Sequence, residues 1–303
     1  MKIFVTGGCG YIGSHTVLQL LKEGNEVIVF DNLETGSERA LDGIESICGK
    51  RPQFINGDLR NFEDINNAMF EDIDCVMHFA AFKSVVESKK DPSGYFENNV
   101  AGTFNLLKAM MKKGVKNIVF SSSAAVYGNP EYLPVDEEHP LNPLVPYATN
   151  KVCMEYILKD LFNMGINSVA LRYFNASGAD ESGKLGEDPN QLGNFIPRVF
   201  KASIGEYSLQ VRGRNLNTRD GSAIRDYVHV SDLADGHVKA LHWLLKQGKV
   251  CEVFNLCSGE GSTVLEVVNA VKEITGRDFK YDIVDIEEGE AITVTGSYEK
   301  AEK

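Results

Sequence analysis

Thr6-Gly7-Gly8-Cys9-Gly10-Tyr11-Ile12-Gly13 follows directly on the apolar run Ile3-Phe4-Val5. Apolar residues then recur at helical spacing over 11–21, and a second apolar run, Val27–Phe30, ends in Asp31. This order of strand, glycine turn, helix, strand and acid is typical of a dinucleotide-binding βαβ unit. A strand–turn–helix without a ligand is the alternative, and the agreement of all the parts speaks against it.

The glycines and the acid also indicate which dinucleotide is bound. Gly7, Gly10 and Gly13 allow a tight turn, a close approach of the pyrophosphate and close packing of the helix on the strand. The N-terminus of that helix offers N–H groups to the phosphates. Asp31 lies 18 residues after Gly13, near the ~20-residue spacing at which an acid binds a ribose hydroxyl. Because a 2′-phosphate would meet a like charge there, we predict NAD as the cofactor.

Composition excludes several classes of protein. The chain has 303 residues, 43% hydrophobic and 24% charged, as is usual for globular enzymes. Its net charge of −12 argues against nucleic acid as a partner. The six cysteines form no C-x-x-C pair, so neither a metal site nor a disulfide framework is expected. No run approaches the ~18 apolar residues of a membrane span. With a strand beginning at residue 2, we expect no signal peptide and a cytoplasmic location.

Strand-like and helical segments alternate through the first half of the chain. Further apolar runs occur at Gln53–Asn56, Cys75–Phe79, Asn117–Phe120 and Ser168–Leu171. The longest helical segment between them is Tyr95–Met111. This alternation predicts an α/β fold with a doubly wound, Rossmann-like parallel sheet. After residue 175, glycines and charged loops replace the long apolar runs. We expect an NAD-binding domain over 1–175 and a smaller C-terminal substrate lobe over 176–303, with Arg225–Lys249 packing back on the first.

A tyrosine and a lysine four residues apart are candidates for catalysis. Tyr147 and Lys151 follow Pro146 at the start of a predicted helix and share one of its faces. A tyrosine with its usual pKa of ~10 is a poor base at neutral pH. The Lys151 ammonium and a cationic nicotinamide are expected to lower that pKa. Tyr147 can then take a proton from a substrate hydroxyl while hydride leaves for NAD. Ser123, near a strand end, can hydrogen-bond the same hydroxyl.

With these features the chain resembles the UDP-glucose 4-epimerases of the extended short-chain dehydrogenase/reductase family. The glycine spacing G-x-x-G-x-x-G is that of this family. The motifs that carry the resemblance are Val5–His15, Asp31–Leu33, Gly57–Arg60, His78–Ala80, Asn98–Thr103, Ser121–Gly128, Pro146–Lys151, Leu171–Asn175, Gly186–Pro189 and Arg225–Asp235.

The resemblance implies an NAD-dependent isomerase, a homodimer, that epimerises UDP-glucose and UDP-galactose at C4 through a 4-keto intermediate. It implies three groups of site residues. The catalytic residues are Ser123, Tyr147 and Lys151. The NAD site comprises Gly7, Gly10, Tyr11, Ile12, Gly13, Asp31, Asn32, Asp58, Leu59, Phe79, Ala80, Lys83, Asn98, Lys151 and Phe174. The UDP-sugar site comprises Lys83, Ser123, Tyr147, Asn175, Asn194 and Arg225, and Phe174 is also expected to face the UDP-sugar.

The chain departs from the family pattern in its last part. Glu287 stands where the family carries an arginine for the UDP diphosphate. Three explanations are open: UDP binding is weak, the corresponding basic segment lies elsewhere, or the diphosphate is bound by Arg212, Arg219 and Arg225. The C-terminus is also shorter than in the family. Val294 falls where the family places a gate against the sugar's C2 substituent, and a small residue there predicts that N-acetylated sugars are accepted.

Three other functions stay open at this point. One is another NAD-dependent nucleotide-sugar epimerase, a dehydratase or a decarboxylase on the same scaffold, although Ala124 and Ala125 stand where the dehydratases and decarboxylases carry acids. Another is a reductase that releases its cofactor. The third is a non-catalytic NAD-binding sensor, which Glu287 and the short C-terminus favour and the intact Ser123, Tyr147 and Lys151 oppose.

Overall fold

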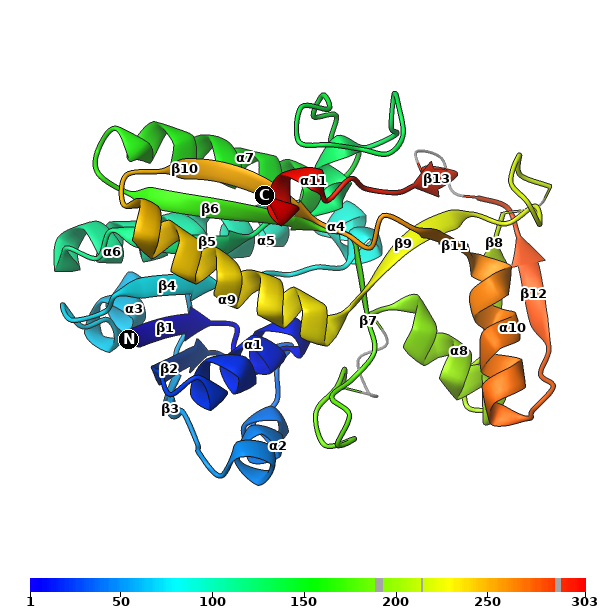
Figure 1. Ribbon diagram of the computed structural model, residues 1–303, viewed down its shortest axis with the longest axis horizontal. Helices are drawn as coiled ribbons and strands as arrows, with labels where there is room; N and C mark the ends of the chain where they lie inside the picture. Colours follow the sequence, from blue (N-terminus) through cyan, green and yellow to red (C-terminus); the bar gives the residue numbers. More distant parts are fainter. Residues whose placement is uncertain (189–192, 214, 287–289) are drawn as a thin grey trace.

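The computed structural model describes residues 1–188, 193–213, 215–286 and 290–303. Its first lobe is built on a seven-stranded sheet in which every neighbouring pair is parallel (Figure 1). In spatial order the strands are β3 (Gln53–Asn56), β2 (Glu26–Asp31), β1 (Lys2–Thr6), β4 (Cys75–His78), β5 (Asn117–Ser121), β6 (Asn167–Tyr173) and β10 (Cys251–Leu256). The prediction of a doubly wound parallel sheet is confirmed.

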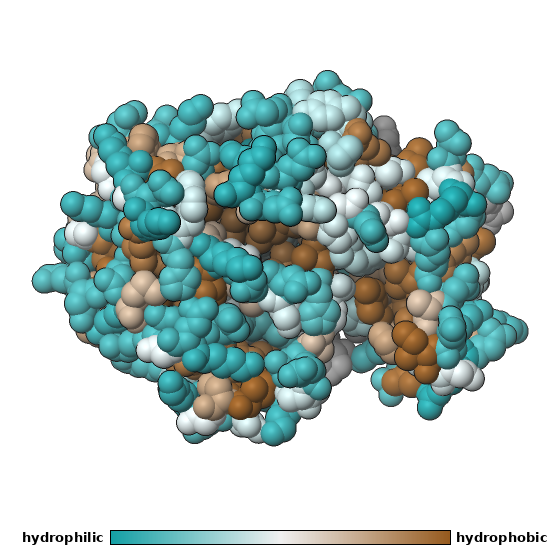
Figure 2. Space-filling model, viewed as in Figure 1, coloured by the Kyte–Doolittle hydropathy of each residue, from teal (hydrophilic) through white to brown (hydrophobic). Residues whose placement is uncertain are grey.

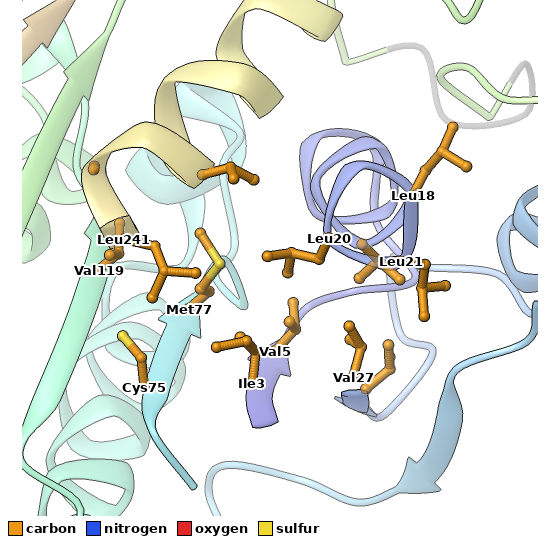
Figure 3. Close-up of a cluster of buried hydrophobic side chains, with 14 of the residues drawn as sticks. Ile3, Val5, Leu18, Leu20, Leu21, Val27, Cys75, Met77, Val119 and Leu241 are labelled. Atoms are coloured by element: carbon orange, nitrogen blue, oxygen red, sulfur yellow. The ribbon is translucent and has the colours of Figure 1, made fainter. Parts of the chain in front are cut away.

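Helices cover both faces of this sheet. On one face lie α1 (Tyr11–Lys22), α2 (Arg39–Cys48) and α9 (Val230–Gln247). On the other lie α3 (Phe62–Ala68), α6 (Gly102–Lys113) and α7 (Pro146–Phe162). Figure 3 shows the first face, where Leu20 of α1 and Leu241 of α9 meet Val5 and Met77 of the sheet. Such fully buried aliphatic layers are the main source of stability in a doubly wound fold.

The order of the strands places a ligand cleft. The chain runs outward from β1 through β2 to β3 and then crosses back to β4 on the other side of β1. The connections on the two sides of this switch point diverge, which leaves a crevice at the carboxyl ends of β1 and β4. The glycine turn after β1 and the Phe79–Lys83 segment after β4 therefore line one space.

The helix predicted over Tyr95–Met111 has a wider turn in its middle. It consists of α5 (Pro92–Phe96), a π-helical turn over Glu97–Ala101, and α6. The short helix α4 (Val85–Lys90) precedes it. A π-helical turn rotates the side chains that it contains and is often found at functional sites. Here it contains Asn98, one of the residues assigned to the NAD site.

The second lobe is smaller and formed by short elements. β7 (Asn175–Ser177), β9 (Ile224–His229), β11 (Gly261–Thr263) and β13 (Thr293–Val294) form one sheet, and β8 (Leu209–Arg212) pairs with β12 (Tyr281–Val284). Helices α8 (Phe195–Ser203) and α10 (Val264–Thr275) pack on the β8–β12 pair, and α11 (Glu299–Glu302) lies against β10. Figure 2 shows hydrophobic residues gathered over α8 and α10, where Phe200, Ile204 and Ile274 are exposed.

The chain returns to the first lobe between these elements. After β9, α9 packs along α1, and β10 then pairs with β6 at the edge of the main sheet. The first lobe thus also contains α9 and β10, whereas Arg225–His229, at the start of the segment expected to pack on it, belong to β9 of the second lobe. Among the helices of the described ranges, none combines the length and apolar character of a membrane span.

Candidate active site

The backbone of the glycine turn after β1 packs so closely against neighbouring backbone atoms that two of its positions have no room for a side chain. Gly7 has a φ of 72°, and a Cβ there would lie 2.5 Å from the backbone nitrogen of Ala80. A Cβ on Gly13 would lie 2.2 Å from the carbonyl oxygen of Gly7. Both positions therefore require glycine. Gly10 caps the N-terminus of α1 and leaves the first N–H groups of that helix facing the cleft. This bare backbone fits the phosphates of a dinucleotide.

The acid at the end of β2 lies beside the turn. The Asp31 carboxylate accepts hydrogen bonds from the backbone N–H groups of Cys9 (3.0 Å) and Leu33 (2.9 Å). Burial nevertheless raises the pKa of Asp31. Asn32 next to it donates to Asp58 at 2.9 Å, and Arg60 pairs with the same carboxylate and holds its pKa at about 2. Asp31, at the end of β2, thus lines the cleft, and Asp58, after β3, holds Asn32 beside it.

The segment after β4 is fixed by the π-helical turn. The side chain of Asn99 accepts from the backbone N–H of Phe82 at 2.8 Å and donates to the carbonyl of the same residue at 3.0 Å. Asn98, its neighbour, lines the cleft and donates to Asn99. Asn99 therefore anchors Phe82 in the segment after β4, and no such role was assigned to Asn99 from the sequence.

One face of α7 carries the candidate catalytic pair. Pro146 is the first residue of the helix, as predicted, and Tyr147 and Lys151 are both buried and line the cleft. Ser123 hydrogen-bonds the Tyr147 hydroxyl and caps the 3₁₀ helix Ala124–Tyr127. Lys151 donates to the carbonyl oxygen of Ser121 at 2.7 Å. The structure thus brings the serine, tyrosine and lysine together.

Burial shifts the pKa values of Tyr147 and Lys151 in directions that the sequence did not predict. We expected the Lys151 ammonium to lower the pKa of Tyr147. Burial instead raises the pKa of Tyr147 to about 12, and only the hydrogen bond from Ser123 opposes it. Burial also lowers the pKa of Lys151 to about 7, against the negative charge of Glu155, which raises it. A buried cation gives little help to a neighbouring phenol when the cation itself is disfavoured.

A segment of the second lobe crosses over the cleft. We call 178–188 the strap. Its Gly178 carbonyl accepts from the Tyr11 hydroxyl at 2.6 Å, and its Lys184 ammonium donates to Ser46 of α2 at 2.8 Å. Leu185 is buried among the side chains of α1 and α2. The strap therefore joins the second lobe to both helices beside the glycine turn.

Two residues assigned to ligands meet at the end of the strap. The Glu187 carboxylate pairs with Lys83 at 3.2 Å and accepts from Asn194, the N-cap of α8, at 2.9 Å. The Glu187 side chain is only 7% exposed, whereas that of Lys83 is 51% exposed. A buried carboxylate thus orients one residue from each lobe.

Together these segments enclose a cleft of about 420 Å³, within the usual range for ligand sites. Most of the assigned residues line it: Gly7, Gly10, Tyr11, Ile12, Gly13, Asp31, Asn32, Leu59, Phe79, Ala80, Lys83, Asn98, Tyr147 and Lys151. Asp58 and Ser123 stand behind this lining and contact it through Asn32 and Tyr147. Tyr173 and Glu187 line the cleft as well and were not singled out in the sequence.

The other assigned residues lie in the second lobe or in its core. Phe174 is buried in a separate apolar cluster with Val126 and Tyr127, and does not line the cleft. Asn175, on β7, is exposed and donates to the carbonyl of Asp226 at 3.1 Å. Arg225, on β9, pairs with Glu290 at 3.1 Å.

Arg212 also pairs with Glu290, whereas Arg219 pairs with Glu266 at the start of α10. Val294 of β13 lies in register with Arg225 and packs beside the Phe174 cluster. Glu287, the acid in place of an expected arginine, lies outside the described residues. The predicted acceptance of N-acetylated sugars stays a prediction.

Comparison with known proteins agrees with this geometry. Residues 3–257 match the NAD dependent epimerase/dehydratase family. The chain belongs to this family. Its cleft accordingly suits the family cofactor, NAD, because a Cβ on Gly7 or Gly13 would collide with neighbouring backbone atoms and Asp31 lines the cleft beside the glycine turn.

Relatives within the epimerase/dehydratase family cover the whole chain. UDP-glucose 4-epimerase of Bacillus subtilis (strain 168) is 44% identical over 308 residues, which is 100% of this chain and 91% of the relative. UDP-glucose 4-epimerase from Bifidobacterium longum, solved with NAD⁺ and UDP, is 41% identical with a TM-score of 0.95, covering 100% of this chain and 91% of that one. The enzyme from Stenotrophomonas maltophila, solved with NAD and formylated UDP-arabinopyranose, is 38% identical with a TM-score of 0.95, covering 99% and 91%.

Proposed function

We propose that the chain is an NAD-dependent UDP-glucose 4-epimerase, which interconverts UDP-glucose and UDP-galactose through a 4-keto sugar. The observation that carries this proposal is the contact of Ser123 with the hydroxyl of Tyr147, which lines the cleft one helical turn from Lys151. Relatives with that name, more than 40% identical over the whole chain, support the choice of substrate.

In this mechanism Tyr147 is the base. Its phenol takes the proton from the C4 hydroxyl of the sugar, and Ser123 donates a hydrogen bond that favours the phenolate. NAD, when held by the lining of the cleft, would supply the acceptor and donor for the C4 hydride. Lys151 is held by the Ser121 carbonyl with its amino group beside the Tyr147 ring, and a cationic nicotinamide bound in the cleft would lower the pKa of the phenol. Ala124 and Ala125 offer no acid for an elimination, which argues against a dehydratase.

We also propose a division of the two lobes between the two ligands. The first lobe, including α9 and β10, would hold NAD through the lining of the cleft. The second lobe would hold the UDP-sugar through Asn175, Asn194 and Arg225, with Lys83 reaching the substrate from the first lobe. Support comes from the positions of these residues: Asn194 shares Glu187 with Lys83, and Arg225 lies on β9 beside β7, which carries Asn175.

The experiment is an epimerase assay without added cofactor. Purified protein is incubated with UDP-galactose, UDP-glucose is followed, and the supernatant of denatured protein is assayed for NAD. We expect turnover and about one dinucleotide per chain, because the strap and the glycine cradle enclose the site. Absence of UDP-glucose even with NAD supplied would refute the proposed function.

We further propose that the chain acts as a homodimer in the cytoplasm. Large apolar side chains are exposed on the neighbouring helices α5, α6 and α7, namely Phe96, Phe104 and Tyr156. Exposed apolar patches of this kind favour association. All six cysteines carry free thiols, which suits a reducing compartment. Light scattering of the wild type and of Phe104→Glu tests the dimer, and a wild-type monomer at micromolar concentration would contradict it.

A further inference from the structure

Three consecutive serines at the end of β5 each contact a different residue of α7. Those residues follow one another at four-residue spacing and so share one face of the helix. The pairs are Ser121 with Lys151, Ser122 with Glu155 and Ser123 with Tyr147. The first and last pairs belong to the proposed chemistry. The middle pair does not line the cleft and so has no direct part in the reaction.

Glu155 in this middle pair is a buried carboxylate. Its side chain is 7% exposed and accepts from the Ser122 hydroxyl and from two nitrogens of Arg172 on β6. The Arg172 contacts are 3.0 Å from Nε and 2.6 Å from Nη2, a bidentate pair. A buried ion pair often adds little net stability compared with apolar residues of similar size. A contribution to folding stability alone therefore does not explain why Glu155 and Arg172 are paired here.

Arg172 also contacts the segment that follows Ser123 in the sequence. Its Nη1 donates to the Tyr127 hydroxyl at 3.0 Å, and its guanidinium lies 5.0 Å from the centre of the Tyr127 ring. Tyr127 ends the 3₁₀ helix that Ser123 caps. The short segment that carries Ser123 is thus held at both ends by one ion pair, through Ser122 before it and Tyr127 after it.

We propose that Glu155 is a positioning residue for the epimerisation, an inference that rests on the function proposed above. Through Ser122 and Arg172, its carboxylate fixes the backbone on both sides of Ser123 and so sets the Ser123 hydroxyl against the Tyr147 phenol. Residues that act through one another in this way give non-additive effects when both are replaced.

The sharpest variant is Ser122→Ala, because it removes one donor to Glu155 and leaves the ion pair with Arg172 intact. We expect kcat with UDP-galactose to fall about tenfold, while KM and the bound NAD stay within about twofold of the wild type. Glu155→Gln should lower kcat further, and it also removes a charge near Lys151. Ser203→Ala is the matched control: this serine is also nearly buried and donates to a local carbonyl, that of Phe200 on α8.

The double variant Ser122→Ala/Ser123→Ala separates positioning from a general structural effect. If Ser122 acts through Ser123, the kcat of the double variant should lie within about twofold of the kcat of Ser123→Ala alone. A second full tenfold loss would overturn the proposal. If Glu155→Gln does not fold, the comparison of Ser122→Ala, Ser123→Ala and the double variant is sufficient to test the proposal.

A measurement on the cofactor-free protein gives an independent answer. Amide hydrogen exchange over 121–128 should become faster in Ser122→Ala and Glu155→Gln and stay unchanged in Ser203→Ala. Unchanged exchange in the first two variants would also overturn the proposal. A wild type without epimerase activity would instead refute the proposed function and leave the exchange result standing, so the two failures are distinguishable.

Discussion

Lys151 donates to the carbonyl of Ser121 at 2.7 Å, and its ammonium lies 5.8 Å from the centre of the Tyr147 ring. The lysine is therefore attached to the strand that precedes the site, and the Tyr147 hydroxyl has Ser123 as its partner. In the protein alone, burial governs both groups and disfavours both charged forms. A cation bound beside the phenol would lower its pKa, so the base becomes effective only in the loaded site.

The buried lysine gives the cofactor-free protein a distinctive pH dependence. Lys151 has a pKa of about 7 when folded and 10.5 when unfolded. Between these values the unfolded chain binds a proton that the folded protein does not. The free energy of unfolding therefore rises with pH in this window, by on the order of 1 kcal/mol per pH unit.

Lys151→Met should lose this rise, and Lys159→Met, at an exposed position of the same helix, should keep it. Denaturant unfolding of the NAD-free proteins between pH 7 and 10.5 measures the difference. Parallel curves for wild type and Lys151→Met would show that the lysine stays protonated when buried.

Tyr147→Phe should abolish most of the turnover and leave the cofactor bound. The phenol is the candidate base, and loss of a general base costs about 10²–10⁴-fold in rate. The remaining ring still packs in the buried site. Tyr156→Phe, the same change on the exposed side of α7, should have no effect. The measurements are kcat and NAD content, and near-normal turnover in Tyr147→Phe would place the base elsewhere.

Gly13→Ala should empty the cofactor site. The added Cβ would lie 2.2 Å from the Gly7 carbonyl oxygen, so the turn must shift and the cradle for the phosphates is lost. Gly24→Ala is the control, because Gly24 lies just after α1 with a φ of 84° and no atoms within 4 Å. It should cost about 1 kcal/mol in stability without changing NAD content. Normal NAD content in Gly13→Ala would contradict the role of the turn.

Arg225 and Arg219 should differ in their effect on substrate binding. Arg225 is partly buried on β9 and pairs with Glu290, whereas Arg219 pairs with Glu266 at the start of α10. Arg225→Met should raise KM for UDP-galactose roughly tenfold to a hundredfold, because the variant loses a charge-assisted contact with the diphosphate of the substrate. Arg219→Met should leave KM unchanged. An unchanged KM in Arg225→Met would show that Arg225 does not contact the diphosphate.

The first βαβ unit could be predicted almost to the residue. The helix expected over 11–21 is α1, Tyr11–Lys22, and the strand ending at Asp31 is β2. Local periodicity and turn residues decide such elements. The π-helical turn at Glu97–Ala101 could not be predicted, because the apolar spacing runs through it without a break. The pairing of β10 with β6 depends on contacts distant in sequence and was missed for that reason.

In the candidate site, too, residues in short local motifs could be predicted, whereas those that depend on distant contacts or on side-chain direction could not. Tyr147, Lys151 and the glycines were found because each belongs to a short motif with fixed spacing. Tyr173 and Phe174 are adjacent, and only Tyr173 lines the cleft while Phe174 packs into an apolar cluster. Successive side chains of an extended segment point to opposite sides, and sequence alone did not settle which side faced the ligand. Glu187 was missed because its partners, Lys83 and Asn194, come from different lobes.

The strap has a consequence for how the protein responds to its surroundings. A dinucleotide beneath 178–188 leaves only when the Tyr11–Gly178 hydrogen bond, the Lys83–Glu187 pair and the packing of Leu185 give way together. We therefore expect a bound cofactor to stay with one chain through many reaction cycles without exchanging with the dissolved pool. The rate of sugar interconversion would then be insulated from swings in the ratio of oxidised to reduced nicotinamide in the cell.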